Sequence, residues 1–288
     1  PVPTNTSAPP SAPVISGRLA YSEFDEVNRI FSVKVVELPS KKEVISIFNA
    51  GQPSLSPDGT KLAYISWANN HIGLYSISLT DKTQNTISVM LEAYRPQWSF
   101  DSKSTVFEFI KEEQKEIHFS DTPGDGVPLE KGQTPAWTPD GRLVVQACQG
   151  TRCGLAVVNT NGSGFKFLTD DITDIAPAVS PNGQWVAYTR NQNENWDVWL
   201  IELAGGKPVR LTTTPGRDGI PTWSPNGELI AFAAETEPGR WSIQVIRPDG
   251  TGRQTLLEVA GNLDGENCIN VCRESGPGWT HESISWSR

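Results

Sequence analysis

Five copies of one phrase can be laid over one another along this chain, and this repetition constrains the architecture more than any other feature. The copies read PSLSPDGTKLAYIS from Pro53, PQWSFDSKSTVFEF from Pro96, PAWTPDGRLVVQA from Pro135, PAVSPNGQWVAYTR from Pro177 and PTWSPNGELIAFAA from Pro221. A sixth copy is divided between the two ends of the chain. Its first half is Ile284-Ser285-Trp286-Ser287, and Gly17-Arg18-Leu19-Ala20-Tyr21-Ser22 supplies the second half.

The spacing of the copies predicts a propeller. Successive repeat prolines are 39 to 44 residues apart, and a wider interval of 63 residues precedes Ile284. About 40–45 residues is the length of one four-stranded blade. Within each copy, Ser-Pro-Asp-Gly or Ser-Pro-Asn-Gly is a tight-turn sequence between two short apolar runs. The sequence therefore predicts an all-β fold with six four-stranded blades.

The divided copy predicts how the ring closes. A strand around Trp286 should lie innermost in one blade, with strands from residues 17–22 and 30–36 beside it. First and last strands would then share one sheet, which leaves only short, protected edges.

These residues resemble the WD40-like Pro-Asp repeat of TolB-type propellers, most closely at Pro221–Phe232, and the resemblance covers residues 17–288. Members of that family are mostly periplasmic or exported; many bind other proteins, and others are the propeller halves of serine peptidases. The copy at Pro96 departs from the pattern, because Phe100-Asp101-Ser102 replaces Pro-Asp-Gly. We expect another turn geometry there.

Composition favours an extracytoplasmic protein, whether periplasmic, cell-surface or secreted. The net charge of −9 disfavours nucleic acid and anionic lipid as partners, because both select basic patches. No run of residues is apolar and long enough to predict a transmembrane segment. The chain starts at Pro1 and its one methionine is Met90, which predicts a processed or trimmed chain.

Residues 1–14 differ in composition from the propeller at 15–288. The segment PVPTNTSAPPSAP is uncharged and cannot bury enough apolar surface to fold alone. It is interpreted either as a flexible tether to an upstream anchor or as an arm that docks on a neighbouring subunit. Asn5-Thr6-Ser7 and Asn161-Gly162-Ser163 match the N-glycosylation pattern, which matters only in a glycosylating organism.

The four cysteines form two closely spaced pairs. Cys148 and Cys153 flank a predicted hairpin turn, and Cys268 and Cys272 lie in an insertion at about 259–283. Two local disulfides are predicted, which indicates an oxidising compartment. A zinc site is the alternative, but the spacings match no four-ligand pattern.

Catalytic and metal-binding motifs are scarce. The sequence has no Gly-x-Ser-x-Gly elbow and no paired histidine motif, so we predict that the protein is not an enzyme and has no cofactor. Three residues before the repeat proline, or before Ile284, stand Asp174, Asp218 and His281. These three could hold a calcium ion, but the favoured interpretation is that each aspartate caps its own loop.

Function is therefore predicted to be binding. The first hypothesis is a non-catalytic extracytoplasmic scaffold that binds a protein partner through loops on a rigid ring. The alternative is self-association, with the chain as a structural subunit of an extracellular filament or surface layer assembled through the N-terminal arm. A propeller half of a hydrolase or lyase that lacks its catalytic part is the third option. The arm and the insertion are the expected partner site, with Asp264, Glu266 and Trp279 as candidate contact residues.

Overall fold

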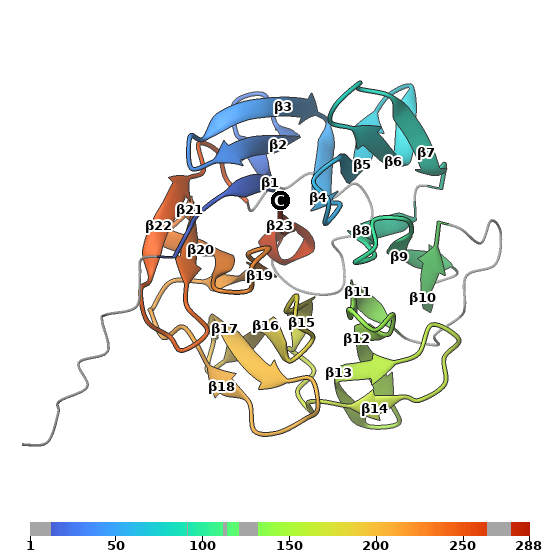
Figure 1. The fold of residues 1–288 in the computed structure, drawn as a ribbon, viewed down its shortest axis with the longest axis vertical. Helices are drawn as coiled ribbons and strands as arrows, with labels where there is room; N and C mark the ends of the chain where they lie inside the picture. The colour runs from blue at the N-terminus through green and yellow to red at the C-terminus, as the bar shows by residue number, and fades with distance from the viewer. Residues whose placement is uncertain (1–12, 91, 112–113, 121–131, 264–277) are drawn as a thin grey trace, which may run out of the picture.

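A computed structural model describes residues 13–90, 92–111, 114–120, 132–263 and 278–288. Its strands form six sheets around a central axis, and each sheet is one blade of a propeller (Figure 1). Blade 1 contains β23 (Ile284–Ser287), β1 (Gly17–Asp25), β2 (Ile30–Leu38) and β3 (Lys42–Phe48). Blade 2 contains β4 (Ala50–Leu55), β5 (Lys61–Ala68), β6 (His71–Ser78) and β7 (Gln84–Ser88). Blade 3 contains β8 (Ala93–Trp98), β9 (Thr105–Lys111) and β10 (Gln114–Phe119), and blade 4 contains β11 (Gln133–Trp137), β12 (Leu143–Gln149), β13 (Arg152–Val158) and β14 (Lys166–Phe167). Blade 5 contains β15 (Ile175–Val179), β16 (Trp185–Gln192), β17 (Asn195–Glu202) and β18 (Val209–Arg210), and blade 6 contains β19 (Asp218–Trp223), β20 (Ile230–Glu237), β21 (Arg240–Ile246) and β22 (Gln254–Glu258). A short 3₁₀ helix, η1 (Gly278–His281), precedes β23.

The ring closes as the divided repeat predicts. In blade 1 the order is β23-β1-β2-β3, so the last strand of the chain is innermost and pairs antiparallel with the first. Leu19 lies opposite Trp286 in this pairing, and both side chains are buried. The prediction of an all-β, six-bladed fold closed by both termini is confirmed.

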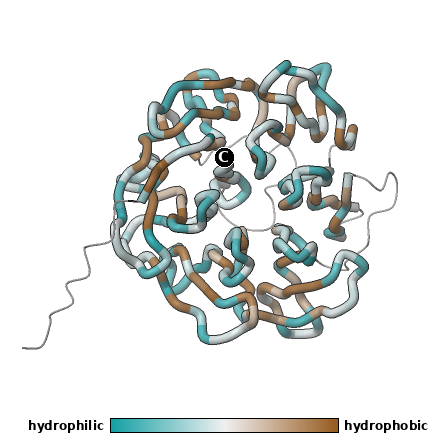
Figure 2. Tube along the Cα trace, in the orientation of Figure 1, coloured by the Kyte–Doolittle hydropathy of each residue, from teal (hydrophilic) through white to brown (hydrophobic). Residues whose placement is uncertain are grey.

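The apolar core is divided among the joints between blades. Six clusters of buried side chains are found in the described residues, and each draws on two adjacent blades. Figure 2 shows the corresponding hydrophobic stretches in every blade, interrupted by hydrophilic turns. The largest cluster fills the joint between blades 6 and 1 and includes Trp241, Trp279 and Trp286. The joint that closes the ring therefore holds the largest apolar cluster among the described residues.

The inner turns share one geometry, including the divergent copy. At the consensus turn, Ser56 Oγ donates to Asp58 Oδ1 over 2.6 Å and Gly59 has φ +72°. In the divergent copy, Ser99 Oγ donates to Asp101 Oδ1 over the same 2.6 Å, and Ser102 takes φ +61° in place of glycine. The expectation of another geometry here is wrong. The serine–aspartate contact fixes the turn, and a serine tolerates the left-handed conformation that glycine adopts more easily.

A bulge recurs immediately before the repeat proline in five inner strands. The bulged residue has φ between +46° and +54° in each case: Gln52, Arg95, Thr134, Ala176 and Ile220. The ladder register shifts at the same places. Such a φ is uncommon for any residue but glycine and an outlier for a β-branched isoleucine, so the surrounding structure must hold it.

These bulges aim backbone N–H groups at the preceding blade. Gln52 N donates to Ser22 Oγ over 3.2 Å, and Arg95 N donates to Gln52 Oε1 over 2.7 Å. Thr134 N donates to Glu108 Oε2 over 3.2 Å, and Ile220 N donates to Thr189 Oγ1 over 2.8 Å. Each of these four joints therefore has a polar contact of its own beside its apolar cluster.

The first predicted disulfide is present. Cys148 and Cys153 are opposed across the β12–β13 hairpin, and their sulfurs are 2.04 Å apart. Cys268 and Cys272 lie outside the described residues. Within the described part of the chain, no helix is long and apolar enough to cross a membrane.

Replacing Cys148 and Cys153 together by serine should lower the free energy of unfolding by about 1–3 kcal/mol, the low end for disulfides because the loop is short. Urea unfolding with and without a reductant measures this cost. Reductant should destabilise the wild type more than the double variant. An equal response of the two proteins would contradict a stabilising role for this bond.

Candidate functional site: the central channel

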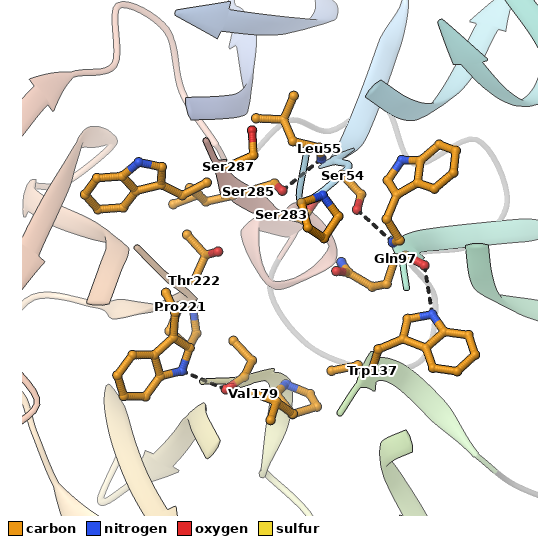
Figure 3. A pocket seen from close by; sticks show the side chains of 18 of the residues that line it. Ser54, Leu55, Gln97, Trp137, Val179, Pro221, Thr222, Ser283, Ser285 and Ser287 are labelled. Atoms are coloured by element: carbon orange, nitrogen blue, oxygen red, sulfur yellow. Dashed lines mark hydrogen bonds between the residues drawn. The ribbon is translucent and has the colours of Figure 1, made fainter. Parts of the chain in front are cut away.

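The inner strands of all six blades line one cavity of about 500 Å³ on the axis of the ring. The wall is built from the repeat phrase itself. Figure 3 shows how the polar and proline side chains of the repeat lie around this cavity. Figure 1 shows β23 inside the ring, so the closing strand forms part of the wall.

The wall along most of its length is uncharged. Ser54, Gln97, Thr222, Ser283 and Ser285 contribute hydroxyl and amide groups, and Figure 3 shows these side chains around the cavity. Between them lie the repeat prolines of blades 4, 5 and 6. The wall therefore offers rigid apolar surfaces separated by neutral hydrogen-bonding groups.

The repeat tryptophans connect neighbouring inner strands by hydrogen bonds and do not fill the cavity. Trp137 Nε1 donates to the Gln97 carbonyl in the preceding blade over 3.2 Å, and its indole points away from the channel (Figure 3). Trp223 Nε1 donates to the Ala178 carbonyl over 3.0 Å in the same way. The channel keeps its width because these side chains brace neighbouring inner strands.

Charged groups line the channel at both ends: Asp58, Asp101 and Arg288 lie beside the turns that follow the inner strands, and Arg95 and Glu282 lie where the inner strands begin. Arg95 donates to Glu108 Oε2 through Nη1 over 2.7 Å, and its Nη2 lies 2.7 Å from His281 Nδ1. Arg95 thus links blade 3 to the segment that precedes β23. Beside it, Glu282 Oε2 accepts the Gln52 backbone N–H over 3.1 Å, and burial raises the pKa of Glu282.

His281 must be neutral in this arrangement. An arginine can only donate hydrogen bonds, so Nδ1 of His281 is the acceptor and Nε2 carries the proton. Burial lowers the pKa of His281 to about 4, and the positive charge of Arg95 contributes to the shift. Glu108 acts in the opposite direction, and Lys115 adds to the lowering.

We expect this histidine to make the ring sensitive to acid. Its pKa is about 6.5 when unfolded and about 4 when folded, so between these values the unfolded chain binds more protons. The stability that neutral His281 contributes is present above pH 6.5 and is lost as the pH falls towards 4. At about 1.4 kcal/mol per pKa unit, the loss approaches 2–3 kcal/mol at pH 4.5.

The Asn variant His281→Asn keeps an acceptor for Arg95 and cannot titrate. Urea unfolding at pH 7.5 and pH 4.5 should therefore show a larger loss for the wild type than for this variant. Glu282 titrates in the opposite sense in both proteins, because its folded pKa is raised. Equal losses in the two proteins would contradict the assignment to His281.

The three residues considered for a cation site are held apart by separate partners. Asp174 accepts two hydrogen bonds from Arg190, of 2.5 and 2.7 Å, and Asp218 accepts two from Arg253, of 2.8 and 3.0 Å. Their partners are therefore arginine side chains of their own blades as well as local loop groups, and His281 is paired with Arg95. In the described ranges, no three histidine, cysteine or acidic side chains are grouped as a metal site would require.

The candidate partner residues of the insertion divide into two groups. Asp264 and Glu266 lie outside the described residues. Trp279 is fully buried (0% exposed), with its ring centroid 5.2 Å from that of Trp241 and 6.0 Å from that of Trp196. In this structure its surroundings are the apolar core of the closing joint, not a free surface.

The repeat pattern does not predict the charged group formed by Arg95, Glu108 and His281. Glu108 occupies the place in the second strand of its copy where the aligned copies carry Ile65, Thr189 and Ala233. One charged residue inside an otherwise apolar strand is the signal that could have pointed to a buried partner. Nothing local in the sequence links it to His281, because blades 4, 5 and 6 lie between the two residues along the chain.

Comparison with known proteins assigns the chain to a family. The model of the PD40 TolB β-propeller domain matches residues 5–217 and, in a second alignment, residues 52–266. The chain belongs to the TolB β-propeller family. Within this family, the Tol-Pal system protein TolB 1 of Novosphingobium aromaticivorans is 37% identical over 73 residues, which cover 25% of this chain and 16% of that protein. The TolB protein of Francisella tularensis is 25% identical over 189 residues, covering 60% of this chain and 43% of that protein.

A solved TolB structure shares the fold. The TolB protein of Acinetobacter baumannii superposes with a TM-score of 0.73 at 21% identity, over 85% of this chain and 64% of that one. The chain spans less than half the length of the two curated TolB relatives. The TolB propeller is thus the shared part, and the activities of whole TolB proteins do not transfer with it.

Proposed function

We propose that this chain is a non-catalytic, extracytoplasmic propeller that binds a protein partner at its central channel. The observation that carries the proposal is the channel wall, where six inner strands present prolines and neutral hydroxyl and amide groups around one cavity. Concave sites of this kind, with apolar surfaces and a few polar groups, are where ligands usually bind. A cavity of about 500 Å³ can hold a few residues of a peptide segment of another protein.

Each of the three histidines contacts a group that holds its side chain in place, rather than a nucleophile. His281 is paired with Arg95, His118 with Glu116, and His71 with the carbonyl oxygen of its neighbour Asn70. A catalytic histidine would instead face a nucleophile or a substrate proton. These contacts support a binding role.

Two observations support a location outside the cytoplasm. The Cys148–Cys153 disulfide suits an oxidising compartment. The curated relatives are named as Tol-Pal system proteins, and we infer by analogy that this chain also acts within a protein assembly of the cell envelope.

The insertion at 259–283 joins the channel through η1. Thr280 lies within η1 and Glu282 directly follows it, and both line the cavity, so a partner held by the insertion would lie close to the channel. In this proposal Asp264 and Glu266 remain partner contacts, and Trp279 is the buried anchor that holds the end of the insertion.

A photo-crosslinking amino acid tests the proposal. Phe100 lines the channel, whereas Phe48 lies on the outermost strand of blade 1 and is exposed. Placed at position 100 of the full chain in its native envelope, the crosslinker should capture a protein of defined mass, and placed at position 48 it should not. Equal capture from the two positions, or none from position 100, would reject the channel as the binding site.

A further inference from the structure

We propose that the channel of one copy of this chain receives part of residues 1–12 of a second copy. The inference rests on the proposed function and names one partner for the same site. It is carried by the chemistry of the channel wall, by the composition of the N-terminal segment, and by the path along which the described chain leaves the ring.

The channel selects an uncharged occupant. Its charged residues lie at the two ends, and the one nearest the start of the inner strands, Arg95, is held by Glu108 and His281. A charged side chain in the middle of the channel would exchange its hydration for neutral hydroxyl and amide groups, which is costly. Hydroxyl and amide groups such as those of Gln97, Thr222 and Ser285 can instead pair with the backbone of a neutral segment.

The N-terminal segment has the matching composition. Residues 1–17 contain no charged side chain, and residues 1–13 include five prolines, four serines or threonines that carry hydroxyl groups, and little else of bulk. Segments of this kind favour the extended polyproline II conformation, whose backbone carbonyls stay free to accept hydrogen bonds. Pre-extended chains are recognised at low entropic cost in rigid grooves.

The described residues that follow this segment lead away from the channel of their own ring. Trp286 Nε1 donates to the Ser16 carbonyl over 2.8 Å, and Ile15 packs against the apolar cluster between blades 6 and 1. The chain before β1 therefore passes over the joint between these blades, on the outer side of the inner strand. The described residues before β1 therefore do not enter the channel of their own ring.

The segment is long enough to reach a neighbour. In the polyproline II conformation, twelve residues span about 37 Å, at about 3.1 Å per residue. A ring in contact with the first one is within its reach.

A labelled peptide tests the proposal on the full chain. The peptide PVPTNTSAPPSAP should bind saturably in a fluorescence polarisation titration. Thr222→Arg places a charge and a long side chain in the wall, so affinity for the peptide should fall at least about tenfold. The matched control Thr236→Arg, on the exposed β20–β21 hairpin, should bind as the wild type does. A peptide that carries Thr6→Asp and Ser11→Asp should bind at least about tenfold more weakly to the wild type. This comparison does not depend on the folding of any protein variant.

Sedimentation velocity identifies the second copy. The mass of the full chain should rise with concentration, and unlabelled peptide should return it to the monomer. The proposal is overturned if the peptide does not saturate, if Thr222→Arg and Thr236→Arg bind it equally, or if the full chain is monomeric at every concentration. The crosslink from position 100 separates the two proposals. Capture of residues 1–12 of another copy supports both, whereas capture of a different protein alone supports the binding function and rejects this occupant.

Discussion

Removing residues 284–288 should open the ring and destabilise the fold by at least about 5 kcal/mol. The truncation deletes β23, the innermost strand of blade 1, and removes Ile284 and Trp286 from the cluster between blades 6 and 1. Burial of one large apolar side chain contributes about 1.5–3 kcal/mol, and loss of a buried tryptophan costs about 3–5 kcal/mol when the cavity persists. The total stability of a domain is about 5–15 kcal/mol, so little cooperative folding should remain.

Thermal unfolding followed by near-ultraviolet circular dichroism measures this loss. Deletion of the exposed Arg288 alone is the matched control and should change the melting temperature little. If the chain without residues 284–288 melts within a degree or two of the intact protein, the ring does not depend on the shared blade.

Replacing Trp279 by alanine should cost about 3–5 kcal/mol, the second largest effect expected from a local change. Its indole is fully buried and packs so closely over Gly219 that a Cβ atom there would lie 2.7 Å from it. Few neighbouring groups can move into the space, because the same ring also contacts Trp241 and Trp196.

The half-buried Trp185 is the control, and its replacement by alanine should cost clearly less. Urea unfolding of the two variants compares the losses directly. A Trp279 variant as stable as the Trp185 variant would mean that the indole is available for a partner at little structural cost.

The fold could be predicted from the sequence because the repeat phrase occurs six times, once for each blade. The Pro-x-Trp-Ser strand and the Ser-Pro-Asp-Gly turn recur at blade-length intervals, and the divided copy at Trp286 specifies closure. The turn at Ser102 was mispredicted, because the prediction gave weight to the missing glycine rather than to the retained serine and aspartate.

The candidate site could be predicted only in part. Sequence comparison among copies identifies Asp174 and Asp218 as polar positions, but their arginine partners lie elsewhere in each blade and at different distances along the chain. The contact between Arg95 and His281 joins residues that are 186 positions apart in the sequence. Such contacts depend on which blades lie side by side in the ring. A repeat with a period of about 40 residues predicts the blades but not the side-chain contacts between them.

The bulges before the repeat prolines give the six similar blades an order. At each joint where the bulged N–H group is paired, the accepting side chains differ: a serine and Glu282 for Gln52, a glutamine for Arg95, a glutamate for Thr134 and a threonine for Ile220. A blade moved to another position, or duplicated into a seventh, would meet the wrong acceptor and leave a buried N–H group unpaired, at a cost of about 1–3 kcal/mol. The apolar repeat makes the blades alike enough to stack, and these four contacts differ from joint to joint, so they favour the order of blades that the chain has.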